Sequence, residues 1–538
     1  MPKSTWTAAA TATLGGDRPT TATTGAQASK FPLLYQVNTR VLVSETAGAR
    51  ARPATLDDLP DDLFDRAAAR GFSWIWMLGV WQTGLAGQQG ARAPASRADL
   101  QNDLPDLRDA DIVGSPYAIV GYDVHRDFGG DLALARLRER MHRRDLRLLV
   151  DFIPNHVALD HPWVDAHPEF FIEGNEDDLR REPKNYVALQ TTRGRRILAH
   201  GRDPNFWGWN DTLQLNFRHA GLRAAMLAEL GRIAERADGV RCDMAMLLEP
   251  EVIARTWGER AQPRDGTPPV DRTFWPEAIA RTRQRHPRFL FVAEAYGGLE
   301  WRLQEEGFDF TYDKRLYDRL RAAEARPVRQ HLEATPAFRE RTLHFLENHD
   351  EPRAATAFPP DIHRAAAVAS FLVPGLRLFH EGEFEGRQAH TAIHLARRMA
   401  ERPDKAMAAF YERLLVCLRR PETHDGVWRL CACRAAWSGN ATWDNFIAFT
   451  WEGQGSDRND RNDGRLLAAI NYGPTRGQCY AQFGFDGFHG LDEGVLVLTD
   501  LLGEARYERA GRTLAREGLY LDLPSWGYNV FDVSRRRE

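Results

Sequence analysis

The sequence predicts an α/β protein: a (β/α)8 TIM barrel with an inserted subdomain after the third strand, followed by a C-terminal antiparallel β-sandwich domain. Three observations lead to this fold class. Apolar runs alternate with helical stretches between residues 33 and 419. One segment, about residues 157–216, interrupts this alternation and is rich in Pro, Asp, Trp and Arg. From about Gly426 onward, short β segments separated by turns replace the alternation.

The eight apolar runs are the expected barrel strands, and they fall at residues 33–43, 72–80, 146–153, 239–244, 289–295, 308–312, 342–346 and 376–380. Helices are expected between them, at residues 56–70, 131–144, 221–237, 274–286, 362–372 and 405–419. A loop of about forty residues follows the second strand and contains Tyr117. Loops of that length usually carry function. Sandwich strands are expected at residues 446–451, 466–472, 495–501, 519–523 and 528–533.

A chain of 538 residues is too long for one small core, so more than one domain is expected. Residues 1–30 are rich in Ala, Thr and Gly and lack a signal-peptide core, which predicts a disordered tail. The catalytic barrel is expected over residues 31–424 and the β domain over residues 425–538.

Composition limits the partners and the compartment. The formal net charge of -4 gives no reason to expect nucleic acid as a partner. No stretch is long and apolar enough to predict a membrane span. The five cysteines are an odd number, which favours a reduced, cytoplasmic protein over a disulfide framework. The oligomeric state stays open.

Four strand endings carry the charged and polar residues of a candidate site. In residues 239–244 (GVRCDM), Arg241 and Asp243 are two positions apart and point to the same face of a strand. The other endings are residues 151–156 (DFIPNH), 291–296 (FVAEAY) and 345–350 (FLENHD). An ordinary ion pair would explain one such ending. Four of them predict a barrel whose strand ends build one site.

These four segments resemble, in order and on the expected strands, the four best-known motifs of the α-amylase family of retaining glycoside hydrolases and transglycosidases. The resemblance implies a nucleophile, an acid/base and a transition-state-stabilising carboxylate at Asp243, Glu294 and Asp350, respectively. It implies sugar contacts from His156 and His349, with Arg241 orienting the nucleophile and Asp151 supporting Arg241. It also places Tyr117 where an aromatic ring stacks on the reacting sugar.

Elementary chemistry agrees with these roles. Retention at a glycosidic carbon needs two carboxyl groups, one that attacks and one that protonates the departing oxygen. The neighbouring Arg241 should keep Asp243 ionised. The apolar run before Glu294 and the repulsion from two aspartates should raise its pKa, as a general acid requires. The alternative is a structural ion-pair network, but stability alone gives no reason to gather acids at one end of a barrel.

Several weaker candidates have two interpretations each. Trp207 and Trp209 either stack on sugar or pack the core of the inserted subdomain. Arg353 either contacts the reacting sugar or pairs with Glu351. Cys242 should point away from the site and pack in the core. The glutamates near the eighth strand are expected on a solvated loop: Glu381, Glu383 and Glu385.

The sequence also departs from the family. Residues 244–248 (MAMLL) stand where many amylases have a Lys-His pair near a calcium, so no metal ligands are assigned and no cofactor is expected to be required. Asn155 keeps a structural calcium open. Tyr117 is followed by Ala118, whereas many α-glucosidases have Asp there.

The predicted function is a retaining α-glycosidase that hydrolyses α-glucosides or short α-glucans through a covalent glycosyl-Asp intermediate. Its partner is then a small α-glucoside or an oligosaccharide. One alternative is an α-transglycosidase with the same catalytic residues. The other is a catalytically silent carbohydrate-binding or scaffold protein, which the loss of any carboxylate would have favoured.

Overall fold

The computed structural model describes residues 29–50, 52–453, 464–483 and 494–536. Most of the predicted disordered tail, residues 1–28, lies outside these ranges. Ser29 and Lys30 lie within them, and both are anchored. Lys30 Nζ is 2.8 Å from Oε2 of Glu340, and Ser29 Oγ donates to the carbonyl oxygen of His424. For these two residues the prediction of disorder is wrong, because they bond to the folded chain.

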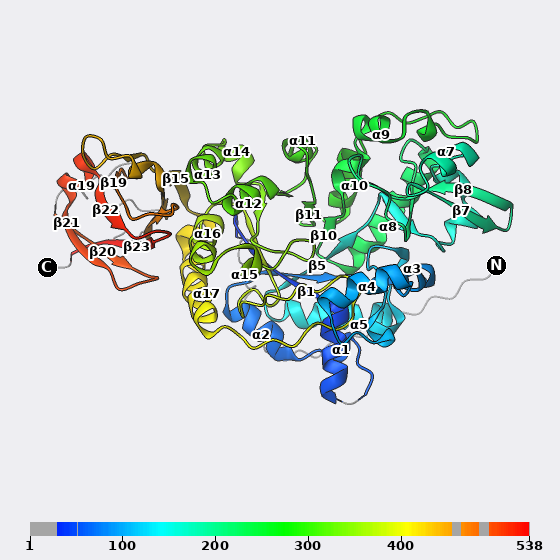
Figure 1. Ribbon diagram of the computed structural model, residues 1–538, viewed down its shortest axis with the longest axis horizontal. Coiled ribbons are helices and arrows are strands. Elements are labelled where there is room, and N and C mark those ends of the chain that lie inside the picture. The colour runs from blue at the N-terminus through cyan, green and yellow to red at the C-terminus, as the bar shows by residue number, and fades with distance from the viewer. Residues whose placement is uncertain (1–28, 51, 454–463, 484–493, 537–538) are drawn as a thin grey trace, which may run out of the picture.

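Eight parallel strands close into a barrel in which the spatial order follows the sequence order. They are β1 (Leu33–Asn38), β2 (Trp74–Leu78), β5 (Arg147–Phe152), β10 (Gly239–Cys242), β11 (Leu290–Ala293), β12 (Phe310–Tyr312), β13 (Thr342–His344) and β14 (Leu376–His380). The strands occupy the centre of the molecule and the helices surround them (Figure 1). The predicted barrel is confirmed.

The helices of the outer ring each have an apolar face, formed by residues three or four positions apart. They include α2 (Asp61–Ala69), α5 (Gly130–His142), α8 (Ala220–Arg236), α10 (Trp275–Arg285), α12 (Lys314–Arg321), α16 (Pro360–Phe371) and α17 (Lys405–Leu418). In α8 the buried side chains include Leu222, Met226, Leu230 and Ile233, whose spacing of three or four residues gives one face of a helix. Asp404 caps α17 by accepting the backbone N–H groups of residues 406 and 407.

Two predictions between the first strands are wrong in detail. The strand expected over residues 33–43 ends at Asn38, and helix α1 (Thr39–Arg50) begins directly after it. Oδ1 of Asn38 accepts the backbone N–H of Val41 at 3.3 Å, which caps the helix start. The long loop after β2 contains five short elements: β3 (Trp81–Thr83), α3 (Leu85–Ala91), α4 (Pro94–Asp103), the 3-10 helix η2 (Asp109–Asp111) and β4 (Ile119–Val124).

The inserted segment lies between β5 and α8, as predicted. Strand β6 (His156–Ala158) pairs antiparallel with β9 (Thr212–Gln214), so the segment leaves and re-enters the barrel at one place. Between them are helix α7 (Glu176–Arg181) and the hairpin of β7 (Tyr186–Thr191) and β8 (Gly194–Ala199). The hairpin projects at the end of the molecule opposite the C-terminal strands (Figure 1).

The C-terminal strands form a six-stranded and a three-stranded antiparallel sheet, which confirms the predicted sandwich. The first contains β15 (Val427–Leu430), β17 (Phe446–Glu452), β18 (Arg465–Asn471), β20 (Val495–Asp500), β21 (Arg506–Ala510) and β23 (Tyr528–Arg535). The second contains β16 (Cys433–Arg434), β19 (Gly477–Ala481) and β22 (Leu519–Leu523). The sequence did not predict β15, β16, β19 and β21.

Strand β17 joins the sandwich to the barrel, because its side chains alternate between two cores. Phe446 and Ala448 pack in the core between the two sheets. Ile447, Phe449 and Trp451 pack in the large hydrophobic cluster that also contains the barrel strands and their helices. The indole N–H of Trp451 also donates to the carbonyl oxygen of residue 372 at 2.7 Å. The β domain is therefore packed firmly against the barrel.

Within the described ranges, every helix is too short or too polar to cross a bilayer.

Candidate active site

The predicted site residues gather at the C-terminal ends of the barrel strands. Asp243 follows β10, Glu294 follows β11 and Asp350 lies beyond β13. His156 begins β6, just after β5. Because the strands are parallel, these ends meet at the same rim of the barrel. The structure therefore brings together the three carboxylates that the sequence singled out.

Arg241 is the centre of this arrangement. Its Nη1 is 2.6 Å from Oδ1 of Asp243, and its Nη2 is 2.7 Å from Oε2 of Glu294. The guanidinium is almost fully buried and lies over the rings of Trp76 and Tyr117, at 5.3 and 5.2 Å from their centroids. One planar cation thus fixes the positions of both carboxylates.

Glu294 has two further donors. Its Oε2 accepts the backbone N–H of Met244 at 2.7 Å, and its Oε1 accepts the hydroxyl of Tyr296 at 2.9 Å. Met244 has a positive φ of 45°, a conformation that L residues rarely adopt. This turn points the backbone N–H of Met244, the residue after Asp243, at the carboxyl group of Glu294.

Asp151 does more than support Arg241. Its Oδ1 is 3.9 Å from Nη1 of Arg241 but accepts the indole N–H of Trp76 at 3.1 Å. Its Oδ2 accepts the backbone N–H of Gly79 at 2.9 Å. Burial raises the pKa of Asp151 to about 7, against the opposing effect of Arg241. This carboxyl group therefore also ties the end of β2 to the site.

The side of the site formed by Tyr117 and His349 is rigid. The hydroxyl of Tyr117 lies 2.6 Å from Nε2 of His349, and Nε2 of Gln36 lies 2.8 Å from Nδ1 of the same ring. Burial lowers the pKa of His349 well below its ordinary value, so the ring is neutral. With the amide of Gln36 donating to Nδ1, Nε2 carries the proton and faces both Tyr117 and Asp350, whose Oδ2 is 3.1 Å away.

Burial dominates the electrostatics of the three carboxyl groups. It raises the pKa of Glu294 to about 6, Arg241 opposes the rise, and Asp243 and Asp350 add to it. This direction agrees with the prediction for a general acid. Burial also raises the pKa of Asp243 above its ordinary value despite the contact with Arg241. The sequence had suggested that Arg241 keeps Asp243 ionised; Arg241 does lower the pKa of Asp243, but burial outweighs it.

His156 lies beside the nucleophile position. Its Nε2 is 3.9 Å from Oδ2 of Asp243, and its ring centroid is 5.0 Å from that of Trp209. Burial lowers the pKa of His156 to about 4, so it is neutral near pH 7 and can bind a sugar hydroxyl. Trp209 is partly buried and packs against the hydrophobic core, as one of its two predicted interpretations had it, and its ring also lies beside His156. Trp207 is exposed, so its predicted alternative role in core packing is wrong.

Arg353 pairs with a glutamate that the sequence did not single out. Its Nη1 is 2.6 Å from Oε1 of Glu347 and 2.7 Å from the carbonyl oxygen of Glu381. The alternative partner Glu351 instead contacts Lys314 at 3.1 Å, so the predicted Arg353–Glu351 pair is wrong. A sugar contact from Arg353 stays a prediction.

The solvated loop predicted for the glutamates near β14 is wrong for two of them. Glu381 and Glu383 are buried. Glu381 accepts the backbone N–H of Asn38 at 2.9 Å, and Glu383 accepts the hydroxyl of Tyr411 at 2.8 Å. Both carboxyl groups hold the strand end in place. Cys242 is buried in the barrel core, which confirms its predicted packing role.

Sequence reasoning did not assign roles to Gln36, Tyr296, Tyr312 and Glu347. The signal in the sequence that could have found these residues is a polar side chain in or next to an apolar strand. Tyr296 and Glu347 even lie inside two of the four motifs. Only the structure shows that Tyr312 OH lies 3.4 Å from Nε of Arg241.

The expected independence of calcium stays a prediction. No group of three or more His, Cys, Asp or Glu side chains suited to a metal occurs in the described part of the chain. Asn155, the residue that kept calcium open, has its Oδ1 2.9 Å from Nε2 of Gln214. Its amide is therefore already engaged within the protein, and no step below depends on a metal.

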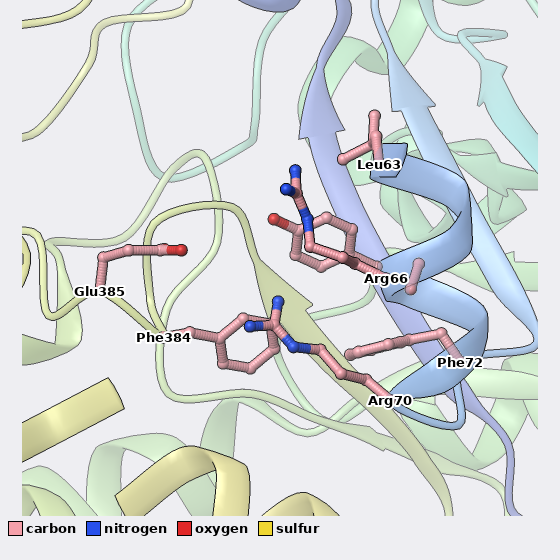
Figure 2. A pocket seen from close by; sticks show the side chains of 8 residues that line it. Leu63, Arg66, Arg70, Phe72, Phe384 and Glu385 are labelled. Atoms are coloured by element: carbon pink, nitrogen blue, oxygen red, sulfur yellow. The ribbon is translucent and has the colours of Figure 1, made fainter. Parts of the chain in front are cut away.

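A separate cavity of about 330 Å³ lies outside the barrel, between α2 and the residues that follow β14 (Figure 2). Arg70 lies over the ring of Phe384 there, at 4.9 Å from its centroid, and also pairs with Glu412 at 2.5 Å. The cavity shares no lining residue with the candidate active site.

A closed parallel barrel with three carboxyl groups, a buried arginine and two neutral histidines at its C-terminal rim has the architecture of a barrel enzyme. Residues 112–414 match the family model described as "Alpha amylase, catalytic domain". This match covers more than half of the chain, and the protein belongs to the α-amylase family.

Curated relatives match parts of the chain. Alpha-amylase MalA of Haloarcula japonica is 26% identical over 277 residues, which cover 50% of this chain and 36% of the relative. Trehalose synthase of Pimelobacter sp. is 24% identical over 291 residues, covering 44% and 46%, respectively. An alpha-1,4-glucan:maltose-1-phosphate maltosyltransferase of Bifidobacterium longum is 25% identical over 238 residues, covering 43% and 25%. The chain thus spans less than half the length of these relatives.

Solved structures support the fold across nearly the whole chain. The maltogenic α-amylase AmyB of Thermotoga neapolitana aligns with a TM-score of 0.64 at 16% identity, covering 94% of this chain and 99% of that one. An α-amylase from Lactobacillus plantarum aligns with a TM-score of 0.60 at 17% identity, with the same coverage.

Proposed function

We propose that the protein is a retaining α-glycosidase that hydrolyses α-glucosidic bonds in α-glucosides or short α-glucans. Asp243 attacks the anomeric carbon and forms a covalent glycosyl ester, while Glu294 protonates the departing oxygen. Glu294 then removes a proton from water, which attacks the same carbon and releases Asp243. Asp350 stabilises the positive charge that develops on the sugar ring.

The observation that carries this proposal is the sharing of Arg241 between the two carboxyl groups, at 2.6 and 2.7 Å. Retention requires carboxyl groups close enough to reach one carbon from opposite sides, roughly 5–5.5 Å apart. Two groups bound to adjacent nitrogens of one guanidinium meet that requirement far better than two groups on separate partners.

Tyr117, His156 and His349 complete the proposed sugar-binding subsite. His156 and His349 each lie beside a proposed catalytic carboxylate, and the hydroxyl of Tyr117 lies beside His349. We propose a smaller contribution to sugar binding for Arg353, because Glu347 already neutralises its guanidinium. We also infer a cytoplasmic, reducing location from the odd number of cysteines.

Transglycosylation is the second candidate, because relatives include a protein named trehalose synthase and others named maltosyltransferases. A sugar hydroxyl would then replace water at the glycosyl-enzyme. Product analysis with a concentrated glucose or maltose acceptor separates the two activities. A silent carbohydrate-binding protein is disfavoured, since all three carboxyl groups are present at the rim.

Proton NMR of the first-formed product tests the mechanism. Two inversions at one carbon should give the α anomer from the wild-type enzyme. Asp243→Asn should keep the fold and reduce kcat by at least about 1,000-fold, because the attacking group is lost. A surface variant, Asp271→Asn, provides a matched control. A β anomer as first product would overturn both assigned roles.

A further inference from the structure

Two large aromatic side chains are exposed next to each other on the inserted segment. The exposed fractions of Phe206 and Trp207 are 71% and 59%, the highest for any aromatic residues in the described ranges. Both lie in the connection between β8 and β9. Adjacent exposed rings form an apolar surface that is costly to leave in water unless a ligand covers it.

The loop that carries these rings is structured. The backbone N–H of Gly208 donates to Oδ1 of Asn185 at 3.0 Å, and the N–H of Phe206 donates to the carbonyl oxygen of Asp203 at 3.2 Å. A Cβ atom on Gly208 would lie 2.6 Å from Cβ of His200, so the loop packs as closely as glycine allows. The rings are therefore held ready for a ligand, which lowers the entropic cost of binding.

This loop leads directly to the candidate active site. Trp209, two residues after Trp207, packs on the ring of His156. His156 in turn is 3.9 Å from Asp243. Two residues span at most about 7 Å, so Trp207 lies close enough for one oligosaccharide to contact both the ring and the site.

Contacts of the same loop join it to a helix that follows the strand of the proposed nucleophile. Nη2 of Arg202 donates to the carbonyl oxygen of Thr256 at 3.3 Å, and its guanidinium lies 5.1 Å from the ring of Trp257. Both partners belong to α9 (Pro250–Trp257). This helix follows the short segment that starts at Ala245, whose N–H donates to the carbonyl oxygen of Glu294 at 3.0 Å. Figure 1 shows α9 and the β7–β8 hairpin at the same end of the molecule.

We propose that Phe206 and Trp207 form a platform that binds the part of an α-glucan chain outside the reacting subsite. This inference rests on the proposed function, and it names the part of the substrate that the platform contacts. The ligand class is a neutral α-glucan oligosaccharide of several glucose units.

The chemistry of the platform suits such a ligand. The C–H face of a glucose unit is apolar and stacks on an aromatic ring, while its hydroxyl groups point outward to water or to donors. Nζ of Lys184 lies over one face of the Trp207 ring, 5.6 Å from its centroid, and the opposite face is the one that a sugar would cover. A charged ligand is not required, since the rings themselves supply the contact.

The experiment measures binding without turnover. In an Asp243→Asn background, calorimetry gives the dissociation constant of maltoheptaose and of maltose for Trp207→Ala and for Phe206→Ala. Trp437→Ala is the matched control, because Trp437 is 54% exposed in the C-terminal domain and lies outside the platform. The expected result is about a tenfold loss of maltoheptaose affinity in each platform variant, a smaller loss for maltose, and none in the control.

A second measurement uses the active enzyme. In Trp207→Ala the KM for maltoheptaose should rise more than the KM for maltose, with kcat changed less than KM. Equal maltoheptaose affinity in Trp207→Ala and in the Asp243→Asn parent would overturn this inference alone. If the parent itself bound no maltooligosaccharide and the wild type hydrolysed none, the proposed function would fail together with it.

Discussion

Nη2 of Arg241 lies 2.7 Å from Oε2 of Glu294, although 53 positions separate the two residues in sequence. The same guanidinium holds Asp243 through Nη1. Two carboxyl groups that share one cation titrate as a coupled unit. A change at Arg241 should therefore shift the pKa of both carboxyl groups, and with them the pH dependence of activity.

Replacing Arg241 by Lys should move the acid limb of the pH profile upward. Arg241 opposes the rise in the pKa of both Asp243 and Glu294, and a lysine ammonium cannot bond both groups in a fixed plane. Asp243 would then ionise only at higher pH. We expect kcat/KM near neutral pH to fall by roughly 100-fold. Profiles of kcat/KM against pH provide the measurement.

The control for this variant is Arg377→Lys, which alters another buried arginine whose partners are backbone carbonyl groups. It should lower the melting temperature without moving the acid limb. An unchanged limb in Arg241→Lys would contradict the coupling.

Glu294→Ala should be severely slow on natural glucosides and much less impaired on substrates with acidic phenol leaving groups, which need little protonation. In the wild type the acid must be protonated, so activity on natural substrates should decline as the pH rises through about 6. Steady-state kinetics with both substrate types, over a range of pH, test the assignment. Equal losses on both types would rule out general-acid catalysis by Glu294.

Tyr296→Phe is a conservative companion to that variant. The hydroxyl of Tyr296 donates to Oε1 of Glu294 at 2.9 Å and stabilises the ionised form. Its removal should raise the pKa of Glu294 and shift the alkaline limb to higher pH, with a loss of kcat below about tenfold. A shift to lower pH would show that the hydroxyl does not act on this carboxyl group.

Glu249→Gln should alter the pH dependence of stability. Glu249 is fully buried, and burial followed by repulsion from Glu306 raises its pKa to about 8 from an ordinary value of 4.5. The folded state therefore holds a proton that the unfolded chain releases, and this group lowers stability as the pH rises from about 4.5 to about 8. The variant should lose that decline.

Melting temperatures of wild type and Glu249→Gln between pH 5 and pH 9, about that window, provide the measurement. Glu305→Gln, an exposed neighbour on α11 (Glu300–Glu305), is the control. Parallel curves for Glu249→Gln and the wild type would show that Glu249 does not titrate in this way.

Chelation should have little effect. Residues 244–248 lack the Lys-His pair that accompanies calcium in many amylases, and Asn155 is bonded to Gln214. We expect EDTA to change the melting temperature by less than about 2 °C, since no bound ion is removed. Melting and activity are measured with EDTA and after adding back calcium or magnesium. A large loss that only calcium restores would refute this expectation.

The local pattern was ambiguous in places. Val41 and Val43 alternate as in a strand, yet both lie within helix α1, so the pattern extended the first strand too far. The cap that Asn38 provides to α1 decided between the two. Short strands such as β16, with two residues, lack a period long enough to detect.

The sequence by itself determined the barrel and the positions of Asp243, Glu294 and Asp350. Eight alternating strand and helix segments are typical of a barrel of this kind, and parallel strands place their C-terminal residues at one rim. Each of these facts depends on neighbours within a few residues, which the sequence displays directly.

Only the tertiary structure decided the partners and the charge states. Arg353 pairs with Glu347 and not with Glu351, and Glu383 is buried where a solvated loop was expected. Burial raises the pKa of Asp243 in spite of Arg241. Ion pairing and desolvation depend on distances between residues far apart in the chain and on the depth at which they lie, and neither quantity exists until the chain has folded.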